Sequence, residues 1–352
     1  MLIKIPEGTV STLLIAVLLI LLPTKGISQI FPSLQGDDLV QALQQTYTPH
    51  NLLNDTQVKD TLYARIFIEG DTVRCIYSAL PRFLPDNVDP SQYLFGSGLE
   101  TNSINLEHSW PQAKGADEGT DGNTDMHHLY PSRTEINSDR ANHPYLNSPD
   151  TETNKWYLLF QEMSNKPNAN IDAYSELGDE LFEPRESVKG DIARAMFYFW
   201  TMYRDDAMEA DPNFFELQRE DLCQWHLQDP AHAFESLRNV RIAEYQGTPN
   251  PFILDCSLAQ RTYCPEISEC TTSADDLPTD LELVFDSANK RVMINTGGGG
   301  SYSLFLINIL GQIVHTDVSD EGNWVQLLDY DGFYFLIVTK GETKKAWKIF
   351  LP

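Results

Sequence analysis

Two neighbouring segments determine the local fold of this chain, NLEHSWP at Asn105–Pro111 and TDMHHLYPSRTEINSDRAN at Thr124–Asn142. The loop between them, Ala113–Asn123, is rich in Gly, Asp and Ala, so it cannot form part of a hydrophobic core. This order predicts a short strand, a loop, a second short strand and a helix. Ser132 followed by Glu135 matches a capping box, so we expect Ser132 to cap the start of that helix.

Asn137 falls inside the predicted helix, where asparagine is a poor helix former because its side chain competes with backbone hydrogen bonds. By itself it would be interpreted as a solvated helical residue. Its neighbours favour a metal site instead. Hydrolysis of a phosphodiester needs a base that takes a proton from water and a cation that offsets the charge on the phosphate. His108 can be that base near neutral pH, and Glu107 and Asn137 offer oxygen ligands of the kind that Mg²⁺ prefers.

Glu107 and His108 are adjacent in sequence, which restricts how they can serve one site. Consecutive side chains of a regular strand point to opposite faces of the sheet. Both can face the same site only if the strand ends or turns there. Trp110-Pro111 directly afterwards is consistent with a strand that ends.

The charge of the chain limits the kind of nucleic-acid contact it can make. Its 352 residues carry a formal net charge of −26, and 41% of them are hydrophobic. A packed core is therefore expected, and a protein that coats nucleic acid with its whole surface is excluded. An enzyme that binds a few phosphates in one local cleft is not excluded by this charge. The acidic surface slows encounter with a polyanion, most strongly at low salt.

The first residues have the pattern of an export signal. An apolar run at Leu13–Leu22 is followed by Pro23 and by small residues at Gly26–Ser28, which predicts a signal peptide over residues 1–28. An uncleaved N-terminal anchor is the alternative. Export permits disulfides, and Cys256–Cys264 is the preferred pair of the five cysteines. An odd number leaves at least one thiol outside an internal bond.

The fold class that we expect is α+β, with two parts. Residues 29–270 form a helix-rich catalytic domain, with helices at Ser187–Tyr203 and at Ala231–Tyr245, the second ending at Gly247. Residues 271–280 read as a linker. Residues 281–352 contain short strand-like runs separated by glycines and predict a small all-β sandwich.

The two segments resemble the bacterial endonuclease I family of extracellular and periplasmic nucleases, within the ββα-metal (His-Me finger) superfamily. The matching pieces are Asn105–Pro111, Asp125–Pro131 and Asn137–Asn142. Further matches are KGDIAR at Lys189–Arg194, Arg238-Asn239 and QGTPNPFI at Gln246–Ile253. The resemblance covers residues 60–265 and implies a helix-rich domain that contains a ββα-metal finger.

The resemblance also implies roles for single residues. It makes His108 the general base, and it makes Glu107 and Asn137 ligands of Mg²⁺ or of another divalent cation such as Ca²⁺ or Mn²⁺. The family uses an arginine near the first loop to stabilise the cleaved phosphate, but here that loop offers only one cation. The remaining expectations are His128 and Arg140 as catalytic residues, Asp125 and His127 as supporting residues, Arg133 and Lys114 as substrate contacts, and Arg133, Arg140 or Arg185 in place of the missing arginine.

The tail resembles the C-terminal sorting domains of the type IX secretion system. The matching pieces are INILGQIV at Ile307–Val314, DGFYFLIV at Asp331–Val338 and KKAWKIFLP at Lys344–Pro352. The resemblance implies a secretion machinery as partner and a protein that is secreted or held at the outer cell surface. An accessory carbohydrate-binding β-domain is the alternative.

The favoured function is a secreted, metal-dependent endonuclease that acts on DNA, with RNA left open as a substrate. Low sequence specificity is expected, because no helix-turn-helix or zinc-finger signature for reading bases is present. We expect a monomer without a membrane span in its mature form. Two other functions stay open: a zinc phosphoesterase with His108, His127 and His128 as ligands, and a non-enzymatic surface adhesin that works through its tail.

Overall fold

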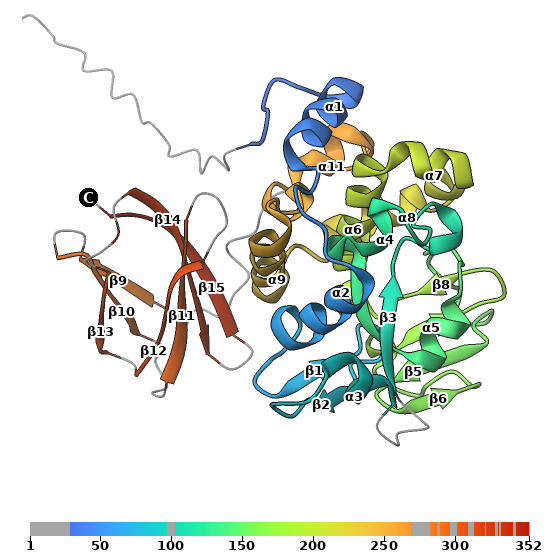
Figure 1. Cartoon of the computed structure of the whole chain (residues 1–352), viewed down its shortest axis with the longest axis horizontal. Helices are drawn as coiled ribbons and strands as arrows, with labels where there is room; N and C mark the ends of the chain where they lie inside the picture. Colours follow the sequence, from blue (N-terminus) through green and yellow to red (C-terminus); the bar gives the residue numbers. More distant parts are fainter. Residues whose placement is uncertain are drawn as a thin grey trace, which may run out of the picture.

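The computed structural model describes residues 29–96, 103–268 and 270, and in the tail 282–286, 289–295, 301–308, 313–320, 322–327, 330, 332–340 and 343–351. The predicted signal peptide and linker lie outside these residues. The described part combines helices and sheets, as expected for an α+β chain (Figure 1). In this part, no helix joins the length and the apolar character that crossing a bilayer requires.

The segment predicted as strand, loop, strand and helix has that structure. Strand β3 (Ile104–His108) pairs antiparallel with β4 (Leu129–Arg133), and α5 (Thr134–Arg140) follows directly. The capping prediction is wrong: the residue before α5 is Arg133, and no side chain caps the helix. Ser132 still belongs to β4, where its hydroxyl donates to the Arg133 carbonyl at 3.2 Å instead of reaching into the helix.

The core of the N-terminal part is built around α6 (Lys189–Met202), which is buried on every side. It packs against α8 (Phe214–Gln228). Trp110 stacks on Phe199 of this helix with 4.8 Å between ring centroids and is fully buried, so this tryptophan belongs to the core. Helix α9 (Ala233–Gln246) ends at Gly247 in a left-handed conformation (φ 86°), as expected from the sequence. The other α-helices of the described residues are α1 (Gly36–Tyr47), α2 (Asp55–Thr61), α3 (Pro90–Gly96), α4 (Asp121–Thr124), α7 (Arg204–Ala210), α10 (Pro251–Leu254) and α11 (Ser257–Thr262).

Two small sheets in this part were not predicted. One is the hairpin of β1 (Thr72–Arg74) and β2 (Pro81–Phe83). The other has the strand order β6-β5-β7-β8. Its strands are β5 (Lys155–Leu158), β6 (Gln161–Met163), β7 (Ser175–Leu177) and β8 (Phe182–Glu183). Strands of two to four residues are too short to show a clear alternation of polar and apolar residues.

The disulfides differ from the predicted pair. Cys223 of α8 is bonded to Cys264, and Cys256 is bonded to Cys270, so the pair Cys256–Cys264 is wrong. Packing of α11 against α8 brings Cys264 to Cys223, although the two are 41 residues apart. Cys75 is a buried free thiol.

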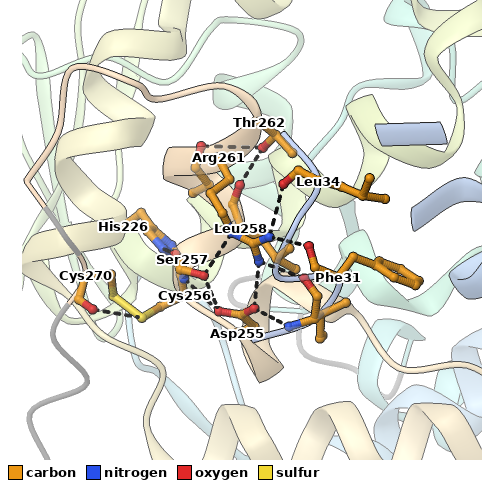
Figure 2. A network of polar contacts seen from close by, with 12 residues as sticks. Phe31, Leu34, His226, Asp255, Cys256, Ser257, Leu258, Arg261, Thr262 and Cys270 are labelled. Atoms are coloured by element: carbon orange, nitrogen blue, oxygen red, sulfur yellow. Dashed lines mark hydrogen bonds and ion pairs between the residues drawn. A yellow bond between two sulfur atoms is a disulfide. The ribbon is translucent and has the colours of Figure 1, made fainter. Parts of the chain in front are cut away.

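The N-terminal segment is tied to the end of this part by a polar network (Figure 2). The guanidinium of Arg261 donates to the carbonyls of Ile30, Phe31 and Leu34. Asp255 accepts from the backbone N–H of Ile30 at 2.8 Å and forms an ion pair with Arg261 at 3.0 Å. These contacts join the first described residues to a segment more than 220 residues later in the sequence.

The tail consists of two antiparallel sheets with the strand orders β13-β10-β9 and β12-β11-β14-β15. Buried side chains from both sheets, such as Val292 and Leu304, form one hydrophobic cluster. The strands are β9 (Glu282–Asp286), β10 (Arg291–Asn295), β11 (Ser301–Asn308), β12 (Ile313–Asp320), β13 (Trp324–Gln326), β14 (Gly332–Lys340) and β15 (Thr343–Leu351).

Candidate active site

Two adjoining pockets open beside β3, and we call them together the cleft. The larger has a volume of about 560 Å³ and is lined by Glu107 and Asn137, among others. The smaller has a volume of about 210 Å³ and is lined by Asp55 and Asn123, among others. The residues that line both pockets are Lys59, Leu106, His108 and Gln112. The cleft therefore gathers the predicted base His108 and the predicted metal ligands Glu107 and Asn137.

Glu107 presents one carboxylate oxygen to the protein. The side chain is only 1% exposed, and its Oε1 accepts a hydrogen bond from the Tyr77 hydroxyl at 2.7 Å. Arg140 Nη1 lies 3.2 Å from the same oxygen. Burial raises the pKa of Glu107, and the nearby Arg140 and Tyr77 act against that rise. Glu107 also lines the larger pocket, so its carboxylate is available to a ligand in the cleft.

Asn137 is oriented by the strand beside it. From α5, its amide Nδ2 donates to the carbonyl of Leu106 at 2.8 Å. That bond fixes the side chain and leaves the amide oxygen without a protein donor among the described residues. A carboxylate oxygen and an amide oxygen on one pocket fit a hard divalent cation that keeps several of its waters. The residues present therefore fit Mg²⁺.

The zinc alternative lacks such a fit. In the part of the chain that the structure describes, no three His, Cys, Asp or Glu side chains come close enough to hold a metal. The ring nitrogens Nε2 of His127 and His128 face the carbonyls of Thr248 and Gly122. The three histidines thus do not converge on one point.

His108 ends β3, as the sequence required for it to share a site with Glu107. Its Nε2 lies 3.0 Å from the carbonyl of Asn123, so this nitrogen carries the proton and donates. Nδ1 then holds the lone pair. Burial lowers the pKa of His108 to about 4, although the contacts with Asn123 oppose this. The ring is therefore neutral at neutral pH and can accept a proton.

His128 lies behind His108 rather than in the cleft. It is fully buried, its Nε2 lies 2.6 Å from the Gly122 carbonyl, and its ring meets that of His108 edge-on with 5.7 Å between centroids. Burial lowers its pKa to about 3. Its contact with the site is the packing of its ring against that of His108.

Asp125 and His127 also lie outside the cleft. Asp125 is fully buried and accepts hydrogen bonds from the hydroxyls of Tyr198 and Tyr203, each at 2.8 Å, and from the amide of Gln246. It thereby joins the segment after the loop to α6 and α9. Asp125 and His127 are therefore held in the interior by contacts with Tyr198, Tyr203, Gln246 and the Thr248 carbonyl.

The cations that the sequence assigned to substrate or catalysis are engaged within the protein. Arg140 is 1% exposed and donates to the carbonyls of His108 and Ser109 at 3.0 and 2.7 Å. Arg133 is 4% exposed and donates to the carbonyl of Leu159. Lys114 lies 2.7 Å from the carboxylate of Asp211. None of the three lines the cleft.

The family profile of Endonuclease I matches residues 42–256, which include every residue of the cleft named above. The chain belongs to the Endonuclease I family.

Curated relatives within this similarity are nucleases. An extracellular ribonuclease of Bacillus subtilis (strain 168) is 30% identical over 236 residues, which cover 62% of this chain and 71% of that protein. An extracellular ribonuclease of Bacillus amyloliquefaciens is 32% identical over 45% of this chain and 53% of its own length. A periplasmic deoxyribonuclease of Aeromonas hydrophila is 32% identical over 37% of this chain and 46% of its own length. The chain thus spans about half the length of the last two relatives.

The sequence did not predict the positive charge of the cleft, nor its acidic lining residues Asp55 and Glu118. In this Endonuclease I family chain, Lys59 comes from α2 and lines both pockets next to His108. The sequence also did not predict Tyr77, which holds the carboxylate of Glu107. Lys59 and Tyr77 both precede the segment Asn105–Pro111 by many residues, and no local pattern in the sequence connects them with His108.

Proposed function

We propose that this chain is a secreted, metal-dependent endonuclease that hydrolyses phosphodiester bonds in DNA, with RNA as an alternative substrate. The observation that carries the proposal is the opening of His108, Glu107 and Asn137 onto one pocket. Extracellular and periplasmic relatives support secretion, and ribonucleases and deoxyribonucleases among them support both substrates.

In the proposed reaction, His108 Nδ1 accepts a proton from a water molecule while the water oxygen bonds to phosphorus. The bond from phosphorus to the leaving oxygen breaks, and that oxygen takes a proton from solvent. His108 then returns its proton to solvent. Glu107 and Asn137 would hold a divalent cation, which when bound offsets the charge that gathers on the phosphate. Asn123 keeps the imidazole in the tautomer that accepts at Nδ1.

Recognition is proposed to rely on phosphates rather than bases, so cleavage should have little sequence specificity and should weaken with added salt.

The tail, residues 281–352, is proposed to direct the protein to a secretion machinery, and the enzyme is proposed to act as a monomer.

The test is digestion of plasmid DNA by the chain from residue 29 onward. We expect nicking and degradation with Mg²⁺, none with EDTA, and none with the His108→Ala variant. His143→Ala is the matched control, since His143 does not line the cleft, and it should cleave like the wild type. Wild-type activity in His108→Ala, or activity in EDTA, would contradict the proposal.

A further inference from the structure

The proposed reaction needs a positive group of the protein at the phosphate. In the transition state, charge gathers on the non-bridging oxygens, and fixed cations that contact them typically contribute the largest part of catalysis. The net charge of −26 makes such a cation more necessary here, because the rest of the surface repels a polyanion.

The arginines and the lysine favoured by the sequence do not supply this charge. Arg140 is buried against Glu107, and Lys114 is bound to Asp211. Arg133 donates to the carbonyl of Leu159, and Arg185 donates to that of Ile76 at 2.9 Å. Each guanidinium or ammonium group already has a partner inside the protein, and none lines the cleft.

Lys59 differs from these residues in position and in pairing. Of the described residues that line the cleft, it alone carries a positive charge, and it lies where the two pockets meet, together with His108. No ion pair joins Lys59 to another described residue. Asp55, one helical turn before it, is instead engaged by Asn123 Nδ2, which donates to Asp55 Oδ1 at 3.1 Å.

The helix that carries Lys59 is held in place at its start. Asn54 directly precedes α2, and its side chain accepts a hydrogen bond from the backbone N–H of Gln57. The Gln57 side chain accepts one from the backbone N–H of Asn54, which completes a capping box. Val58 is buried and anchors the helix to the core. The flexible part of Lys59 is therefore its side chain alone, which is partly exposed and can reach a ligand in either pocket.

We propose that Lys59 contacts the scissile phosphate and stabilises its charge in the transition state. It would take the place of the arginine that the family resemblance implies near the first loop and that this sequence lacks there. The inference rests on the proposed function. Lys59 would then donate a hydrogen bond to a non-bridging oxygen on the same phosphate whose attacking water gives its proton to His108.

The experiment compares wild type, Lys59→Gln and Lys59→Arg on a short labelled DNA duplex, in single turnover over a range of enzyme concentrations. This design separates the maximal cleavage rate from the concentration that gives half of it. We expect Lys59→Gln to lower the maximal rate by about 10²–10³-fold, the usual effect of removing one charge-stabilising donor, and Lys59→Arg to recover most of it. Lys166→Gln is the matched control, because Lys166 pairs with Asp150 outside the cleft. Its replacement changes the net charge by the same amount as Lys59→Gln.

The outcomes separate this inference from the proposed function. An unchanged maximal rate in Lys59→Gln, with only weaker binding of DNA, overturns the inference. Lys59 would then attract the phosphates of the nucleic acid without acting on the scissile one. An equal loss in Lys166→Gln overturns it too. A wild-type enzyme that cleaves neither DNA nor RNA overturns the proposed function and this inference with it. Thermal unfolding of Lys59→Gln within about 2 °C of wild type shows that a lost rate is not lost folding.

Discussion

Arg140 Nη1 lies 3.2 Å from Glu107 Oε1, and both side chains are only 1% exposed. The same guanidinium donates to the carbonyl of His108, and its plane lies over the ring of Tyr145 at 4.4 Å. One buried cation therefore fixes the proposed metal ligand and the backbone of the proposed base. We therefore predict that Arg140 positions these two groups and does not itself contact the substrate.

Replacement of Arg140 should destabilise the protein more than replacement of a surface arginine. In Arg140→Met the carboxylate of Glu107 remains buried without its cation, and breaking a buried pair in this way costs about 3–5 kcal/mol. Urea unfolding measures the loss. The control is Arg74→Met, because Arg74 and Glu69 form an exposed pair, which should cost less than about 1 kcal/mol. Equal losses in both variants would refute the positioning role.

Tyr77 should control how tightly Glu107 holds a metal. Its hydroxyl donates to Glu107 Oε1 at 2.7 Å and lies 2.6 Å from the hydroxyl of Tyr145. Loss of such an orienting partner typically weakens metal affinity about 10–100-fold, so Tyr77→Phe should need that much more Mg²⁺ for half-maximal cleavage.

Tyr157→Phe is the matched control for this variant. It also loses a buried hydroxyl that donates to a carboxylate, that of Asp139, but Asp139 does not line the cleft. Its Mg²⁺ requirement should equal that of wild type. An unchanged requirement in Tyr77→Phe would separate Tyr77 from metal binding.

The site was predictable where its parts are neighbours in sequence. Glu107 and His108 end one strand, and Asn137 follows the paired strand by a few residues, so spacing and residue type were enough. Lys59 and Tyr77 reach the same place from other elements, α2 and the loop after β1, and only tertiary packing brings them there.

Burial explains the other differences between expectation and structure. The sequence shows that Arg140 and Arg133 are cations but not that they are enclosed, so a substrate contact was the natural interpretation. Ser132 has the right spacing from Glu135 for a capping box, yet the strand pairing of Ser132 with Asn105 holds it in extended conformation. The spacing of cysteines likewise could not reveal that α11 packs on α8.

The disulfide between Cys223 and Cys264 should stabilise the folded enzyme. It closes a loop over 41 residues, which in the chain-entropy model contributes roughly 3–4 kcal/mol. Cys223→Ala with Cys264→Ala should lower the unfolding free energy by that amount. The disulfide between Cys256 and Cys270 closes a loop of only 14 residues, so replacing both of its cysteines by alanine should lower the unfolding free energy by less. The reverse order would show that packing around the sulfurs, rather than loop closure, dominates.

Glu176 gives the protein a pH dependence of stability that can be isolated by substitution. It is 6% exposed on β7, and Thr153 donates to its Oε2 at 2.6 Å. Burial raises the pKa of Glu176 from 4.5 to about 7, with help from the charge of Glu183. The folded state therefore favours the protonated carboxyl, and ionising it costs stability as pH rises from the unfolded to the folded pKa.

The Glu176→Gln variant removes this cost while keeping an oxygen that accepts from Thr153. Near pH 4 the two proteins should be about equally stable, and at pH 8 the variant should be more stable by up to about 3 kcal/mol, at about 1.4 kcal/mol per pKa unit. Urea unfolding at both pH values measures the difference. Exposed Glu152→Gln is the control and should follow wild type at both. A variant that is less stable than wild type at pH 8 would mean that Glu176 is folded as a satisfied carboxylate, and the burial argument for its raised pKa would fail.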